Sequence, residues 1–166
     1  THLGHSFPTR RSSDLRRIER LQFLSSSLAA FLRGVAVFDQ AGLEWLLELG
    51  NSSITYRSRY LAVPQLIPVL DLLLLDEQNP HAVLFQLKLV SRTLRRLNDD
   101  FAVPRETGLA PLVERLARFD LGCLENSLFG ETSVRAALDG LADLLQAVAD
   151  ESGRSEEHTS ELQSPP

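Results

Sequence analysis

Two tyrosines and two arginines stand together in the stretch "SITYRSRY", and an aspartate follows in "PVLDLLLLDEQNP". On a helix Tyr56, Arg59 and Tyr60 share one face, because they are three and four residues apart. Arg57 points elsewhere. Asp71 has only apolar helical neighbours, so burying its carboxylate is costly unless it meets a cation or hydrogen-bond donors. We therefore predict an ion pair, shorter than about 4 Å, between Asp71 and Arg57 or Arg59.

This polar cluster allows two interpretations. In the first, the ion pair and the tyrosines form a structural network that fixes how two helices cross. In the second, Arg57, Arg59 and the tyrosines bind an anionic group in a pocket, and Asp71 orients them. We favour the structural interpretation, because structural ion pairs perturb the pKa values of their members just as active sites do.

A second polar group follows at the end of the leucine run. Asp76, Glu77 and Asn79 supply the oxygen ligands that a hard cation such as magnesium prefers. No further ligand spacing supports a metal, so we favour solvated acids and an Asn79 that caps the next helix. Gln86 borders the apolar stripe of that helix and is expected to form hydrogen bonds at the edge of the core.

The sequence offers no independent catalytic signature. It contains no Gly-rich phosphate loop, no Ser-His-Asp set and no Cys-His set. Cys123 is the only cysteine, and we predict it to be a small buried apolar residue, since no nearby histidine activates it. His81 is expected to be exposed. We therefore predict no catalytic residue, no metal and no cofactor.

The elements that must position these residues are helices. Apolar residues recur at three- and four-residue spacing in three long segments. These stripes comprise Ile18, Leu21, Leu24, Leu28 and Leu32; Val83, Leu87, Val90, Leu94 and Leu97; and Val134, Leu138, Leu141, Leu145 and Val148. No alternating strand pattern occurs. The sequence predicts an all-α, antiparallel bundle of about six to seven helices.

Glycine, proline and capping residues mark the ends of the expected helices. Gly34 ends the first helix, and Asp39 and Gly50 bound the second. Pro64 breaks the chain after a third helix that starts at residue 51 or 52. A fourth helix is expected over "QLIPVLDLLLLDE", with Pro68 in its first turn. The pair Asn79-Pro80 opens the helix of the second stripe. A shorter helix is expected to end near Gly122.

Both ends of the chain look foreign to it. Read back into codons, "HSFPTRRSSDL" and "RSEEHTSELQSPP" resemble two common sequencing adapters. We therefore predict a helical domain at 16–153, flanked by adapter-derived tails at 1–15 and 154–166 that pack poorly against it. Three of the four histidines fall in the tails.

The composition limits the partners. The predicted domain holds 14 basic and 18 acidic residues, a net charge of −4, without a basic block. We expect neither a nucleic-acid nor a membrane partner, because no apolar run approaches the ~18 residues of a membrane span. A cytoplasmic location is expected.

The stretch from Ser53 to Leu87 resembles the alpha-E domain family of bacteria. The resemblance rests on "SITYRSRY", "PVLDLLLLDEQNP" and "VLFQL", in that order and spacing. The family places an arginine where this chain has His81 and a serine where it has Ala82. The resemblance implies the C-terminal half of an alpha-E domain, an incomplete domain.

The resemblance also implies a context. Alpha-E domains are fused to, or encoded beside, circularly permuted ATP-grasp proteins, often near transglutaminase-like proteins. Such systems are thought to join peptides through ATP-dependent amide bonds. The leading hypothesis is a non-catalytic partner that docks the ligase or holds its peptide. The alternatives are an enzyme that uses the cluster of Tyr56, Arg57, Arg59, Tyr60 and Asp71, and a purely structural scaffold.

Overall fold

The computed structural model describes residues 7–101, 108–125 and 131–161, and these residues form helices and turns without strands. The seven α-helices are α1 (Phe7–Arg33), α2 (Gln40–Leu49), α3 (Ser53–Tyr60), α4 (Leu66–Leu70), α5 (Val83–Phe101), α6 (Leu109–Ala117) and α7 (Glu131–Glu161). Two short 3-10 turns, η1 (Ala36–Phe38) and η3 (Leu121–Leu124), and a π-helical segment, η2 (Asp71–Leu75), complete the described fold. The predicted all-α bundle is confirmed.

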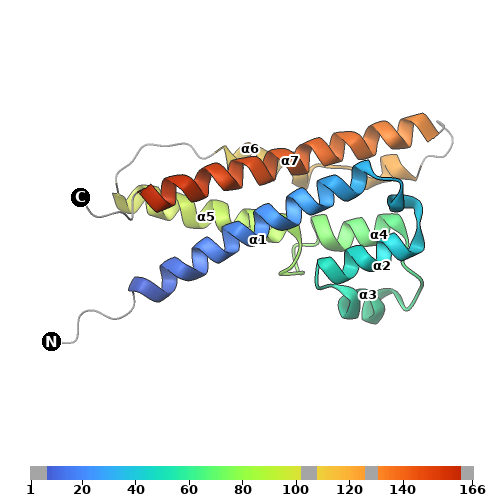
Figure 1. The fold of residues 1–166 in the computed structure, drawn as a ribbon, viewed down its shortest axis with the longest axis horizontal. Helices are drawn as coiled ribbons and strands as arrows, with labels where there is room; N and C mark the ends of the chain where they lie inside the picture. The colour runs from blue at the N-terminus through green and yellow to red at the C-terminus, as the bar shows by residue number, and fades with distance from the viewer. Residues whose placement is uncertain (1–6, 102–107, 126–130, 162–166) are drawn as a thin grey trace.

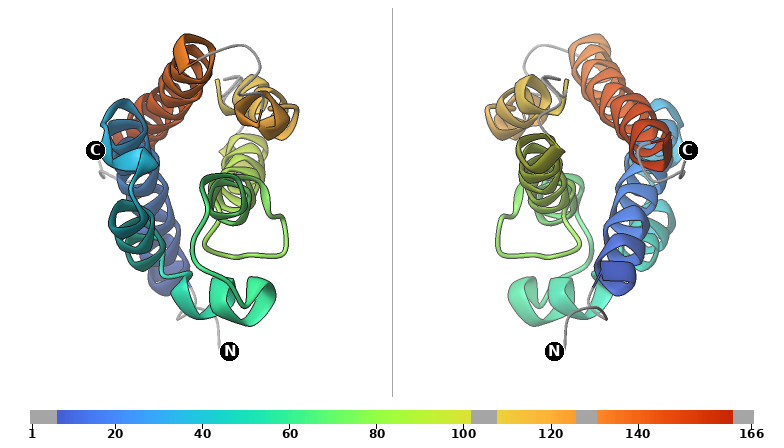
Figure 2. Two further views of the ribbon diagram at one scale, coloured as in Figure 1. Left: turned by 90° about the vertical axis from the view of Figure 1, so that its right-hand side faces the viewer. Right: turned by 90° about the vertical axis from the view of Figure 1, so that its left-hand side faces the viewer.

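The helices pack in two layers. Helices α1 and α7 run antiparallel and contact each other, and α5 lies against α1 (Figure 1). Seen end on, α7, α1 and α2 form one layer, and α6, α5 and α4 form the other (Figure 2). The short helix α3 lies at the edge, on the side away from α7. The core therefore lies between two helical layers.

The apolar stripes read from the sequence line this core. All five stripe residues of α1 are buried, and so are Val83, Leu87, Val90 and Leu94 of α5, whereas the side chain of Leu97 lies outside the described residues. In α7 the last four are buried, while Val134 is half-buried and packs against the core. Burying one such leucine or valine stabilises the fold by about 1.5–3 kcal/mol. The predicted burial of the long helices is confirmed.

A side chain of α7 ties that helix to the end of α1. Arg135 donates to the backbone carbonyls of Leu32 and, at 3.2 Å, Gly34, and it pairs with Asp139 at 2.8 Å. The last carbonyls of a helix lack partners within the helix, so a cation there satisfies them and complements the helix dipole. Gly34 follows the last residue of α1, as predicted.

The second and third helices meet at a tight corner. Helix α2 starts after Asp39 and ends before Gly50, as predicted, although the Asp39 side chain forms no capping hydrogen bond. A Cβ on Gly50 would lie 2.4 Å from a methyl group of Leu73, so the close approach of α2 to η2 requires glycine. Helix α3 starts after Ser52 and ends before the break at Pro64.

Three boundaries differ from the prediction. The fourth helix becomes a π-helix at Asp71, where the Asp76 amide bonds the Asp71 carbonyl at 3.0 Å. Helix α5 begins at Val83, because residues 79–82 form a turn instead of a first helical turn. Helix α6 ends at Ala117, and Asp120 then starts η3 by accepting from the Gly122 amide at 2.8 Å.

The long helices continue past the predicted tail boundaries. Helix α1 starts at Phe7, and α7 runs beyond Gly153 to Glu161. Beyond Gly153, Ser155 is 6% exposed and donates to the Glu151 carbonyl at 2.9 Å. Whether the tails pack poorly against the domain stays a prediction. Residues 1–6 and 162–166 lie outside the described residues, and the predicted adapter origin stays a prediction.

Candidate functional site

The predicted polar cluster is organised by an ion pair between Arg59 and Asp76. Arg59 lies in the last turn of α3, and its guanidinium contacts the carboxylate of Asp76, directly after η2. The other carboxylate oxygen of Asp76 accepts from the Gln78 amide at 2.9 Å. The Asp76 side chain is only 11% exposed, so this pair is better shielded from water than an ordinary surface pair. It fixes α3 against the end of η2.

The prediction that Asp71 pairs with Arg57 or Arg59 is wrong. Asp71 is exposed, and neither arginine forms an ion pair with it within 4.0 Å. The π-helix explains the difference, because its wider turn shifts every later side chain relative to an α-helix. As a result Asp76, and not Asp71, reaches Arg59. Partial desolvation raises the pKa of Asp71, the nearby Asp76 adds to this, and Arg59 opposes it.

The two tyrosines pack on each other behind this ion pair. Their ring centroids lie 4.7 Å apart. Tyr56 is 1% exposed, and its hydroxyl accepts from the Gln65 amide at 3.1 Å and donates to the Val63 carbonyl at 3.4 Å. Tyr56 therefore holds the linker between α3 and α4. Burial raises the pKa of Tyr60, and the negative charge of Asp71 raises it further, so Tyr60 stays a neutral hydroxyl.

Asn79 has a structural position. It is 2% exposed, and its amide nitrogen donates to the Ser52 hydroxyl at 3.2 Å and to the Leu72 carbonyl at 2.9 Å. Its side-chain oxygen accepts from the His81 amide at 3.1 Å. Asn79 thus joins the corner between α2 and α3 to the π-helix. The expected role as N-cap is wrong, because α5 does not start there.

The three residues weighed as magnesium ligands have separate partners. Asp76 faces Arg59, Glu77 pairs with Lys88 at 2.6 Å, and Asn79 points into the corner. Their oxygen atoms are therefore engaged in different directions. Among the residues that the structure describes, no group of three or more His, Cys, Asp or Glu side chains is placed to hold a metal ion.

Gln86 lies at the edge of the core, as expected. It is 7% exposed, and its nitrogen donates to the carbonyls of Pro80 and His81 at 3.3 and 3.4 Å. Its side-chain oxygen is buried without a partner. His81 is half-buried, not exposed, and its Nε2 lies 3.5 Å from the side-chain nitrogen of Asn51.

The structure therefore brings together Tyr56, Arg59, Tyr60, Asp71 and Asp76. Arg57 is exposed on another face of α3, as expected, and Asn79 and Gln86 lie in separate buried positions. The cluster contains a satisfied cation, two acids and two neutral hydroxyl groups. Such a group can position helices and donate hydrogen bonds. It offers no activated nucleophile.

Sequence reasoning missed two features. The first is a set of large apolar side chains at the surface, Phe23, Val35, Phe38, Trp45, Ile54, Leu61 and Val63, each more than half exposed. The second is a hollow between α6 and α7, at which Cys123 is exposed and not buried as predicted. The stripes assign residues to the core, but they do not show which apolar residues the core leaves out.

The fold defines an all-α helical domain. A family model described as a predicted alpha-helical domain with a conserved ER motif, Alpha-E, matches residues 16–160. The chain therefore belongs to the Alpha-E family. No curated protein and no solved structure matches it. Two Glu-Arg dipeptides lie in the matched range, at residues 19–20 and 114–115, and both are exposed.

In the described parts of the chain, none of the helices combines the length and apolar character that crossing a bilayer requires.

Proposed function

We propose that this Alpha-E domain is a non-catalytic partner of an ATP-grasp amide ligase, which it docks or for which it holds the peptide. The partner follows from the family resemblance. The observation that carries the docking role is the concentration of exposed apolar side chains in residues 23–63. Large exposed apolar groups are a common feature of protein-interaction surfaces.

Three of these exposed side chains lie in η1 or in the segments on either side of it. We call them the η1 surface; they are Val35, Phe38 and Trp45, which are 88%, 63% and 52% exposed. Trp45 stacks on Phe31, with ring centroids 6.1 Å apart and an interplanar angle of 24°. A tryptophan held on one side by the core is a rigid contact group, and such aromatic residues often contribute most of the binding energy at interfaces.

The polar cluster supports a structural role beside this docking role. Arg59, which would have to bind an anionic substrate, is already neutralised by Asp76. The Tyr56 hydroxyl is used by the backbone of the linker after α3. An enzyme that used this cluster would have to break contacts that hold α3 in place.

The test combines binding and turnover. A circularly permuted ATP-grasp protein would be titrated with the full chain, and the ATP hydrolysis of that protein measured with and without the chain. We expect binding by the parent chain and a loss of about ten-fold or more for Phe38→Ser/Trp45→Ser, because tryptophan is enriched among the interface residues that contribute about 2 kcal/mol or more.

The matched control is Ala136→Ser, an exposed position on α7 that should leave binding unchanged. Equal thermal unfolding of both variants would show that the loss does not come from misfolding. ATP turnover by the isolated chain, abolished by Asp71→Asn, would overturn the proposal and make the domain an enzyme.

A further inference from the structure

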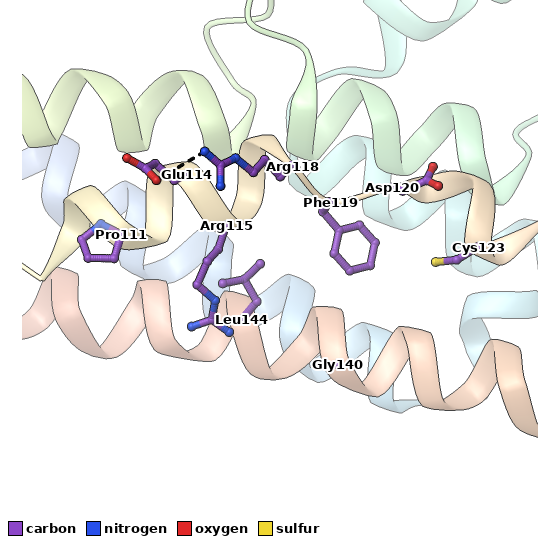
Figure 3. Close-up of a pocket in the computed structure, with 9 residues that line it drawn as sticks. All are labelled: Pro111, Glu114, Arg115, Arg118, Phe119, Asp120, Cys123, Gly140 and Leu144. Carbon is purple, nitrogen blue, oxygen red and sulfur yellow. Dashed lines mark ion pairs between the residues drawn. The ribbon is translucent and has the colours of Figure 1, made fainter.

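A hollow of about 710 Å³ lies between α6 and α7 (Figure 3). Its lining comes from α6, from the segment that leads into η3, and from the middle of α7. The lining residues are Pro111, Glu114, Arg115, Arg118, Phe119, Asp120, Cys123, Gly140 and Leu144. Its size is in the range of small-molecule sites, which are mostly apolar with a few polar groups.

The two arginines of this hollow differ. Arg118 lies 3.7 Å from Glu114, on the side of α6 away from α7. Arg115 extends toward α7 and ends beside Leu144. Among the residues that the structure describes, Arg115 has no ion pair. Its guanidinium therefore lines the hollow without an acidic partner among the described residues, and Phe119 and Leu144 form an apolar part of the same lining.

Gly140 borders open space in the hollow. A Cβ built on this glycine would meet no atom within 4 Å, so neither close packing nor a positive φ requires glycine there. A glycine inside a helix costs about 0.5–1 kcal/mol relative to alanine. The Phe119 ring points toward this part of α7. Glycine at this position adds nothing to the lining beside the ring, and a side chain as large as leucine would extend into the hollow.

We propose that this hollow binds a small apolar monocarboxylate, with its carboxylate on Arg115 and its apolar body against Phe119 and Leu144 beside Gly140. A guanidinium binds a carboxylate through two parallel hydrogen bonds. Asp120, which also lines the hollow, disfavours ligands of higher negative charge, such as phosphates. The C-terminus of a peptide with an apolar last residue belongs to the same chemical class. This site needs no ligase, so it does not rest on the proposed function.

The single cysteine makes the site directly testable. Cys123 is exposed and lines the hollow, so a bound ligand should slow its alkylation by iodoacetamide. Burial and the charge of Asp120 raise the pKa of the Cys123 thiol, so all reactions are run at one pH. The probes are N-acetylleucine, its uncharged amide, and a capped tetrapeptide that ends in leucine. Each variant is compared with its own rate without ligand.

We expect N-acetylleucine to protect Cys123 in the millimolar range and the amide to give no protection. Arg115→Gln should weaken protection about ten-fold or more, because a charge-assisted contact is lost. Gly140→Leu should abolish it without lowering the unfolding temperature. Arg92→Gln, an exposed arginine on α5, should keep it.

Tighter protection by the tetrapeptide than by N-acetylleucine would identify a peptide C-terminus as the ligand, and equal protection would identify a free acid. Equal protection by N-acetylleucine and its amide would overturn the proposal, as would the absence of protection by every probe. Protection that survives both Arg115→Gln and Gly140→Leu would also overturn it.

Discussion

Residues 23–63 and residues 64–161 of this chain differ in how many large apolar side chains they expose. Both regions fill the same core with leucine and valine. The first region also exposes seven large apolar side chains, whereas in its described parts the second exposes none. Every folded protein exposes some apolar residues, because it has too little polar surface to cover itself. That general effect would expose large apolar side chains in both regions, whereas here they are exposed in the first region. The proposed docking role rests on this distribution.

The largest expected difference in stability between a buried and an exposed apolar residue can be measured on one helix. Leu28 and Phe23 both lie on α1, but Leu28 is fully buried and Phe23 is 59% exposed. We expect Leu28→Ala to lower the free energy of unfolding by about 2–5 kcal/mol, because it leaves a cavity in the core. Phe23→Ala should change it by less than about 0.5 kcal/mol. Urea unfolding measures both, and a similar cost for the two would place Phe23 in the core.

The next largest effect is expected where the two regions join. Asn79→Ala removes three hydrogen bonds and leaves the Leu72 carbonyl buried without its side-chain donor. We expect a loss of about 1–3 kcal/mol. Gln78→Ala, at the exposed neighbouring position, should have little effect. If both variants unfolded at the same urea concentration, the corner would not depend on Asn79.

The long helices could be predicted because one physical rule determines them. A stripe at helical spacing must face the core, so residues such as Leu28 and Leu145 were assigned correctly. The ends at Gly34 and Pro64 followed from backbone chemistry that acts locally. These signals are contained in a few adjacent residues.

The candidate site could be predicted only in part, because its contacts depend on the π-helix at Asp71–Leu75, whose turns are wider than those of an α-helix. The tyrosines and Arg59 were found from their spacing on α3. Their acidic partner was assigned to Asp71, because an α-helical spacing was assumed across "DLLLL". The π-helix moves the contact to Asp76. The exposure of Cys123 and the hollow at Gly140 depend on how α6 lies against α7, which no local pattern contains.

A smaller effect should separate stability from binding within the exposed region. Asn51 and Leu61 both have a left-handed backbone, with φ of 49° and 47°. Asparagine adopts this conformation readily, whereas leucine pays about 1 kcal/mol for it, and Leu61 is 89% exposed. We expect Leu61→Asn to raise the free energy of unfolding by up to about 1 kcal/mol. Asn51→Leu should lower it.

If Leu61 contributes to docking, the same Leu61→Asn variant should bind the ligase less tightly although it is more stable. Calorimetric unfolding and a binding titration on one preparation measure the two quantities. A variant that is more stable and binds as well as the parent would limit the docking surface to the η1 surface.

The smallest effect concerns the charge of Asp71. Its pKa is raised in the folded protein by desolvation and by the nearby Asp76. The folded state therefore binds this proton more tightly than the unfolded state, whose carboxyl titrates near 3.8. The contribution of Asp71 to stability is fully present below that pH and is lost as the pH rises through the folded pKa.

At neutral pH, Asp71→Asn should raise the free energy of unfolding, by less than about 0.5 kcal/mol since the side chain is exposed. The gain should disappear near pH 3. A loss of stability in Asp71→Asn at neutral pH would mean that Asp71 has a cationic partner after all, and would return the cluster to the ion pair that the sequence alone predicts.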